Sequence, residues 1–123
     1  MEKSILIVDD EPDILSALTL FLESLNHFKV YQAISGNEAL SIISKNNIDL
    51  VISDVRMPDG DGIFLIKQLK NKLTHGLKFI FMTGYSDLNQ KDALDLGAIE
   101  ILRKPFDLSV LESSVLKALS NAS

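Results

Sequence analysis

Cysteine is absent from the chain, and this absence removes several kinds of chemistry at once. The protein can form no disulfide, no zinc–thiolate site and no cysteine nucleophile, so a cytoplasmic location is the simplest expectation. Long apolar runs are also absent. No stretch approaches the roughly 18 residues that a membrane span needs, and the four apolar residues at 5–8 are too few for the core of a signal peptide. We therefore expect a soluble protein without membrane contact.

A surplus of basic residues is likewise missing. The chain has 12 Lys and Arg against 17 Asp and Glu, which gives a net charge of -5. Binding to nucleic acid phosphates needs a basic face, so we expect no direct contact with nucleic acid. The length of 123 residues, with 46% hydrophobic and 24% charged residues, is typical of one globular domain. We expect residues 1–123 to form that domain, with 120–123 as a linker start or C-terminal tail.

Short apolar runs recur along the chain at regular intervals. Because successive residues are apolar, and not alternate ones, these runs are typical of strands covered on both faces, as in a parallel sheet between helices. The predicted strands are residues 5–8, 30–34, 50–52, 79–82 and 99–102.

The segments between these runs have the apolar spacing of helices, at three and four residues. Pro12 marks the first turn of one helix, Asp107 is a plausible N-cap of the last, and residues 86–96 form the least apolar one. The apolar stripes are Ile14, Leu18, Phe21, Leu22 and Leu25; Ala39, Leu40 and Ile43; Ile63, Ile66 and Leu69; and Leu108, Leu111, Val115 and Leu119.

This alternation predicts an α/β fold, a doubly wound five-stranded parallel sheet with helices on both faces and the flavodoxin-like strand order 2-1-3-4-5. Ligands of such sheets bind beyond the carboxyl ends of the strands, so the residues that follow each strand are informative. These are Asp9, Asp10 and Glu11 after the first strand, Asp54 after the third, Thr83 and Gly84 after the fourth, and Lys104 and Pro105 after the fifth.

Three aspartates at one edge would repel one another unless a cation neutralised them. The carboxylates of Asp9, Asp10 and Asp54 are too few for a calcium cage, so we expect Mg²⁺, or Mn²⁺ in its place. Such a site suits phosphoryl transfer, in which an aspartate attacks phosphorus and positive charge stabilises the transferred group. Lys104 and the Thr83 hydroxyl would contribute to that stabilisation.

Each of these residues has an ordinary structural explanation when it is taken alone, because Asp after a strand is commonly a turn or capping residue. Their joint occurrence at successive strand ends is what indicates a site. Residues 59–62, DGDG, do not meet the EF-hand pattern and are predicted to be a turn. His27 and His75 fall in predicted loops and are expected to be solvated.

Four segments resemble the receiver domains of two-component response regulators: VDDEPDIL, VISDVRMPDGDG, MTGYSD and LRKPFD. The resemblance covers essentially the whole chain. It implies that Asp54 is the phosphoacceptor and that Asp10, Asp54 and the backbone carbonyl of Arg56 ligate Mg²⁺. It also implies that Asp9 assists through a water molecule.

The same resemblance implies that Thr83 hydrogen-bonds the phosphoryl group, that Lys104 pairs with it, and that the bond between Lys104 and Pro105 is cis. The implied donor is a phosphohistidine on a histidine kinase or a histidine phosphotransfer protein. The implied output acts through a domain or target protein that is not in this chain. A homodimer formed on phosphorylation is a further expected partner.

Ile101 departs from the family pattern, which often has Tyr or Phe three residues before the lysine. A swinging aromatic ring is therefore absent, and we expect Thr83 to move towards the phosphate with Ile101 packed behind it. Phosphorylation is expected to repack the face made by the helix at 86–96, the fifth strand and the last helix. Arg56 and Tyr85 should flank the phosphoryl group and slow its hydrolysis.

Two other classes of function remain open at this point. Haloacid dehalogenase-like phosphatases also use an aspartate nucleophile, but they place their two aspartates two residues apart after the first strand, unlike Asp9 and Asp10. An interaction module that is never phosphorylated is the other. Multiple turnover on a phosphate ester would favour the phosphatase, whereas failure to gain phosphate would favour the interaction module. The expected class is a signalling domain and not an enzyme.

Overall fold

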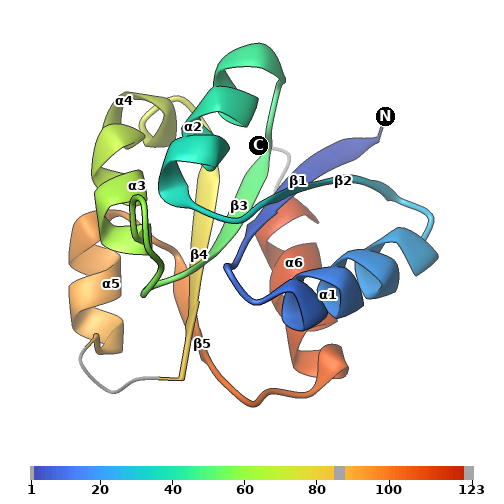
Figure 1. The fold of residues 1–123 in the computed structure, drawn as a ribbon. Helices are drawn as coiled ribbons and strands as arrows, with labels where there is room; N and C mark the ends of the chain where they lie inside the picture. Colours follow the sequence, from blue (N-terminus) through green and yellow to red (C-terminus); the bar gives the residue numbers. More distant parts are fainter. Residues whose placement is uncertain (1, 85–87, 121–123) are drawn as a thin grey trace.

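The computed structural model describes residues 2–84 and 88–120, which form a five-stranded parallel sheet with helices on both faces (Figure 1). The strand order is β2-β1-β3-β4-β5, so the predicted topology is confirmed. The prediction is wrong for two residues that it assigned to strands. Ile34 and Ile99 lie just outside β2 and β5, and their exposed fractions are 55% and 41%. The strands are β1 (Lys3–Val8), β2 (Phe28–Ala33), β3 (Leu50–Asp54), β4 (Lys78–Thr83) and β5 (Glu100–Arg103).

The helices divide between the two faces of the sheet. On one face lie α1 and α6, and on the other lie the four helices from α2 to α5 (Figure 1). Within the described ranges, no helix combines the length and the apolar character needed to cross a bilayer. The helices are α1 (Pro12–Ser24), α2 (Gly36–Lys45), α3 (Gly62–Gln68), α4 (Lys70–Leu73), α5 (Gln90–Leu96) and α6 (Leu108–Ser120).

Alternate residues of the central strands enter two separate cores. In β1, Ile5 and Ile7 pack with α1 and α6, whereas Leu6 and Val8 pack with the helices of the opposite face. All four are fully buried. Both faces therefore need apolar side chains, which explains why the strand sequence is apolar at successive positions.

Several helix boundaries differ from the sequence prediction. The helix predicted at 86–96 begins at Gln90, because the Asn89 side chain accepts a hydrogen bond from the Asp92 backbone N–H at 2.8 Å and caps the helix there. Leu69 does not continue α3 but separates it from the short α4. Leu108 was predicted to be part of the buried stripe of α6, yet it is 44% exposed at the first turn.

Candidate functional site

The carboxyl ends of β1, β3, β4 and β5 meet at one edge of the sheet. The strand register pairs Val8 with Ser53, Asp54 with Met82, and Thr83 with Arg103. The residues that follow β1 and β5 therefore lie next to the ends of β3 and β4. This edge holds a cavity of about 450 Å³ that is lined by Asp10, Glu11, Asp54, Arg56, Gly84 and Lys104.

Lys104 connects the acidic residues of this edge. Its Nζ atom donates hydrogen bonds to Asp9 Oδ2 at 2.8 Å and to Asp54 Oδ2 at 3.0 Å, and it lies 3.7 Å from Glu11 Oε1. Asp9 is fully buried and Asp54 is nearly so. The convergence of these strand-end residues, expected from the sequence, is thus present in the structure.

Burial raises the pKa of Asp54 above its ordinary value, although the hydrogen bond and the charge of Lys104 oppose that rise. Burial alone would lower the pKa of Lys104, but its hydrogen bonds to Asp9 and Asp54 outweigh this effect and hold the pKa above its ordinary value. Lys104 is therefore protonated at neutral pH. One ammonium group faces several carboxylates here, so the electrostatics favour a second cation.

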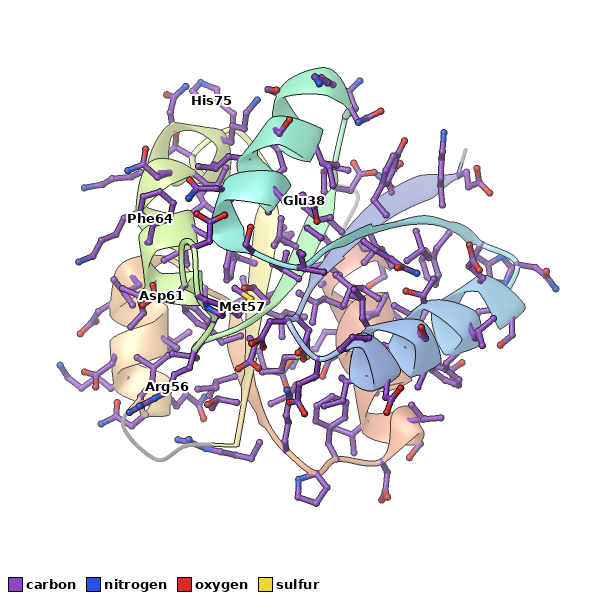
Figure 2. All side chains as sticks on the ribbon, in the orientation of Figure 1. Glu38, Arg56, Met57, Asp61, Phe64 and His75 are labelled. Carbon is purple, nitrogen blue, oxygen red and sulfur yellow. The ribbon has the colours of Figure 1, made fainter. Side chains whose placement is uncertain are left out.

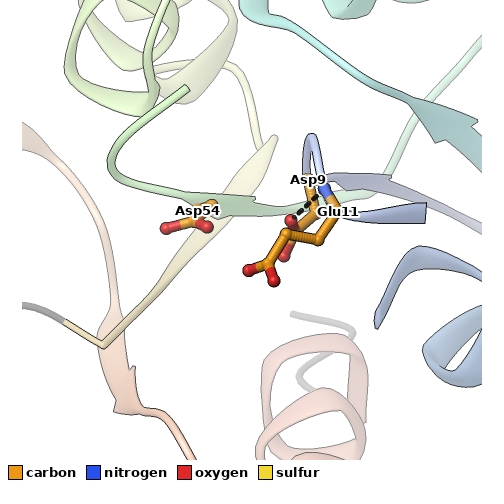
Figure 3. Close-up of side chains that lie close together, drawn as sticks. All are labelled: Asp9, Glu11 and Asp54. Carbon is orange, nitrogen blue, oxygen red and sulfur yellow. Dashed lines mark hydrogen bonds between the residues drawn. The ribbon is translucent and has the colours of Figure 1, made fainter. Parts of the chain in front are cut away.

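The oxygen atoms of this edge fit a small divalent cation. Oxygens of Asp9, Glu11 and Asp54 lie within 4.8 Å of one another (Figure 3). Asp54 Oδ1 is buried, and among the described residues it has no hydrogen-bond partner, although buried carboxylate oxygens are normally partnered. A hard cation such as Mg²⁺ prefers oxygen ligands of this kind and retains several waters, for which the cavity leaves space.

Asp10 and Glu11 are placed differently from what the strand-end pattern alone suggests. Asp10 is exposed and lines the cavity, whereas the close cluster of carboxylates contains Glu11. The Glu11 backbone N–H donates to Asp9 Oδ1 at 2.9 Å, and its side chain makes no capping bond to α1. Sequence reasoning missed Glu11 as a member of the cluster, although its position beside two aspartates was a signal.

Two further predicted residues, Thr83 and Ile101, are not among those that line the cavity. Thr83 is fully buried at the end of β4. Ile101 in β5 is half-buried and packs against the core on the α2–α5 side of the sheet. The Lys104–Pro105 peptide bond is cis, as expected. Tyr85, predicted to flank the phosphoryl group, is outside the described residues.

The chain turns sharply after Asp54. The Gly62 backbone N–H donates to the Val55 carbonyl at 2.9 Å, which closes the loop between β3 and α3. A Cβ atom at Gly62 would collide with the Asp54 carbonyl oxygen, so only glycine allows this approach. Asp61 then caps α3 by accepting from the Phe64 N–H at 2.8 Å. The segment predicted as a turn is therefore part of the support of Asp54.

The fold and this edge together define a doubly wound α/β protein with a lysine-bridged acidic site at the carboxyl ends of its strands. A family model described as the response regulator receiver domain matches residues 5–116. The chain belongs to this family, the receiver domains of two-component response regulators. Members are signalling domains that are phosphorylated on an aspartate.

Relatives of known identity include proteins of similar and of much greater length. The chain is 34% identical over 120 residues to Sporulation initiation phosphotransferase F of Bacillus subtilis, which covers 97% of this chain and 95% of that protein. It is 34% identical over 116 residues to Transcriptional regulatory protein CrdR of Helicobacter pylori, covering 94% of this chain and 54% of that protein. A match to a probable cyclic di-GMP phosphodiesterase of Vibrio cholerae covers only 27% of that protein.

Solved structures agree with this assignment. The response regulator protein TrrA from Thermotoga maritima, in complex with Mg²⁺–BeF, has a TM-score of 0.83 at 34% identity and covers 95% of this chain and 99% of that chain. The receiver domain of the Francisella response regulator 1452 has a TM-score of 0.89 at 28% identity and covers 99% of this chain and 100% of that chain. The predicted family is thus confirmed.

Proposed function

We propose that this receiver domain accepts a phosphoryl group on Asp54. An oxygen of the Asp54 carboxylate attacks phosphorus, the bond from phosphorus to the donor atom breaks, and the donor leaves with the electron pair of that bond. The observation that supports this role is the environment of Asp54: one carboxylate oxygen is bonded to Lys104, and the other is buried without a partner among the described residues.

The residues proposed to hold Mg²⁺, or Mn²⁺, are Asp10, Asp54 and the backbone carbonyl of Arg56, with Asp9 acting through water. Glu11 is added to this set because its carboxylate lies in the same cluster. The cation would neutralise charge on the phosphoryl oxygens during transfer. Lys104 would then pair with the bound phosphoryl group, in addition to Asp9.

The proposed phosphoryl donor is a phosphohistidine on a histidine kinase or a histidine phosphotransfer protein. Membership of the family of two-component response regulators supports this class of donor. The proposed output acts through another chain or domain, since the longer relatives extend well beyond the matched region. A homodimer of the phosphorylated form is part of the same proposal.

The first experiment is intact mass spectrometry after incubation with acetyl phosphate, with and without Mg²⁺. We expect the parent to gain one phosphoryl group only with Mg²⁺, and Asp54→Asn to gain none. Asp95→Asn, an exposed acid that pairs with Lys91 on α5, is the matched control and should behave as the parent. A phosphoryl group retained in Asp54→Asn would contradict the assignment, and release of phosphate over many turnovers would favour a phosphatase.

A further inference from the structure

The loop between β3 and α3 is attached at its far end to the start of α2. Figure 2 labels Arg56, Met57 and Asp61 along this connection and Glu38 in the first turn of α2. The base of the loop is closed by the hydrogen bond from Gly62 to Val55 described above. The attachment of its tip, at residues 59 and 60, depends on the segment that precedes and begins α2.

Asn37 makes most of this attachment. Its side-chain Nδ2 donates to Asp59 Oδ1 at 2.9 Å and to the Asp59 carbonyl at 3.1 Å, and its backbone N–H lies 3.3 Å from the same carbonyl. The Gly36 N–H donates to the Gly60 carbonyl at 2.7 Å. Ser35 Oγ, 3.4 Å from Asp59 Oδ2, adds a longer contact.

The contact is made to a part of the loop that has an uncommon backbone conformation. Asp59 has a φ of 55°, a left-handed conformation that non-glycine residues adopt infrequently. Close approach is also built into α2, because a Cβ atom at Gly36 would collide with the Gly60 carbonyl oxygen. The absence of a side chain at Gly36 and the backbone conformation at Asp59 therefore both allow the loop and α2 to approach closely.

The loop carries Arg56, which lines the cavity beside Asp54. The neighbours of Arg56 are both buried: Val55 is 3% exposed and Met57 is 9% exposed. The backbone at Arg56 is thus held by the core on both sides, through Val55 and Met57, and two residues beyond Met57 the Asn37 contact at Asp59 holds the loop tip. A shift of the loop tip would be transmitted over a short distance to the Arg56 carbonyl.

We propose that Asn37 is a positioning residue for the metal site, acting through Asp59 on the loop that carries the Arg56 carbonyl. This inference rests on the proposed function, in which that carbonyl ligates Mg²⁺. Asn37 is not among the residues that line the cavity in which these groups would bind. Groups that orient metal ligands typically change metal affinity by ten- to a hundred-fold when removed.

The test titrates Asn37→Ala and the parent with MgCl₂. Calorimetry and amide chemical shifts measure the binding of Mg²⁺ to each protein. We expect the Mg²⁺ dissociation constant to rise about tenfold. In phosphorylation by acetyl phosphate, the half-saturating Mg²⁺ concentration should rise to a similar extent, while the rate at saturating Mg²⁺ stays within about twofold of the parent. In metal-free protein, the Gly36 amide should exchange faster with solvent. Asn47→Ala, an exposed asparagine at the other end of α2, is the matched control and should change none of these.

A swapped pair distinguishes positioning from general loss of structure. Asn37→Asp should weaken Mg²⁺ binding at least as much as Asn37→Ala, because it removes the donor and places a second carboxylate beside Asp59. Adding Asp59→Asn reverses donor and acceptor in the side-chain bond, and since Asn tolerates a positive φ it should recover part of the affinity. The recovery is partial because a carboxylate at position 37 cannot donate to the backbone carbonyl of residue 59. An unchanged dissociation constant in Asn37→Ala, or no recovery in the swapped pair, overturns the inference. Failure of the parent itself to bind Mg²⁺ would instead overturn the proposed function on which it rests.

Discussion

Charge balance at the site depends on single residues, above all on Lys104. Its ammonium group is shared between the carboxylates of Asp9 and Asp54, both of which are buried. Burying a carboxylate costs free energy that one shared cation offsets only in part. The pKa of Asp54 is raised because the effect of burial exceeds the opposing effect of Lys104.

Asp54→Asn is therefore expected to stabilise the protein when Mg²⁺ is chelated. Since the pKa of Asp54 is raised on folding, the folded parent binds a proton more readily than the unfolded chain, and its stability falls as pH rises through the folded-state pKa. The asparagine side chain of the variant does not ionise, so its stability does not fall in this way as pH rises. Its advantage in free energy of unfolding should therefore grow as pH rises from the acid range towards neutral pH. Urea unfolding followed by circular dichroism in EDTA measures this, with Asp95→Asn as the control, and an advantage independent of pH would contradict the explanation.

Phosphoryl lifetime is the second property expected to depend on individual side chains. Arg56 is exposed and lines the cavity, and Tyr85 is placed by sequence two residues after Thr83. If their bulk hinders an attacking water, the Arg56→Ala, Tyr85→Ala double variant should lose phosphate about threefold to tenfold faster, a change of about 1 kcal/mol in the barrier. Phosphate release after removal of acetyl phosphate measures the rate, and Lys45→Ala, an exposed basic residue in the last turn of α2, serves as the basic-residue control. Loss at the parent's rate would show that neither side chain shields the group.

The sequence predicted those site residues whose place follows from strand topology. Asp9, Asp54 and Lys104 come one or two residues after apolar runs, and parallel strands bring such positions to one edge. Glu11 and Asn37 were missed for a different reason. The position of Glu11 beside Asp9 and Asp10 was a hint, but the direction of its side chain does not follow from spacing along the chain. The contacts of Asn37 depend on the approach of a distant loop, which spacing does not encode either.

Local structure explains where the predicted elements differ from the observed ones. Apolar spacing placed the start of the fifth helix at residue 86, but the Asn89 cap fixes it at Gln90. Leu108 belongs to an apolar stripe in the sequence. In the structure it is the first residue of α6, where it lines an apolar groove with Pro105 and Phe106. Apolar spacing predicts which side of a helix is buried. The residues that cap the helix determine where it begins.

The loop after β3 is expected to tolerate no side chain at Gly62. In Gly62→Ala the new Cβ would meet the Asp54 backbone carbonyl, which belongs to a fixed strand, so the free energy of unfolding should fall by about 2 to 3 kcal/mol. Gly76→Ala is the matched control, because Gly76 has a φ of 105° but nothing within 4 Å of its would-be Cβ. It should lose only about 1 kcal/mol from backbone strain. Urea unfolding compares the two, and equal losses would mean that crowding at Asp54 is relieved by small shifts.

At the scale of the whole molecule, phosphorylation needs an element that can move at low cost. Within α5, only Ala93 is buried, so few buried contacts resist a shift of this helix. Arg103 in β5 donates to the Leu88 carbonyl at 2.8 Å and links β5 to the segment before α5. Contacts from Thr83 and Lys104 to a charged group are worth roughly 3 to 6 kcal/mol together, and reversing a 1:99 equilibrium takes about 5.5 kcal/mol.

Phosphorylation is therefore expected to change amide chemical shifts over the face made by α5, β5 and α6, beyond the immediate site. The changes should exceed those at the far end of α2, near Lys45, which contacts neither the site nor this face. Thr83→Ala should reduce the changes on α5 while leaving the mass gain at Asp54 intact, because it removes a switch contact and not the acceptor. Nuclear magnetic resonance of ¹⁵N-labelled protein in acetyl phosphate and Mg²⁺ measures both, and Asp54→Asn should show neither. Shifts confined to the cavity lining in the phosphorylated parent would mean that this face does not carry the signal.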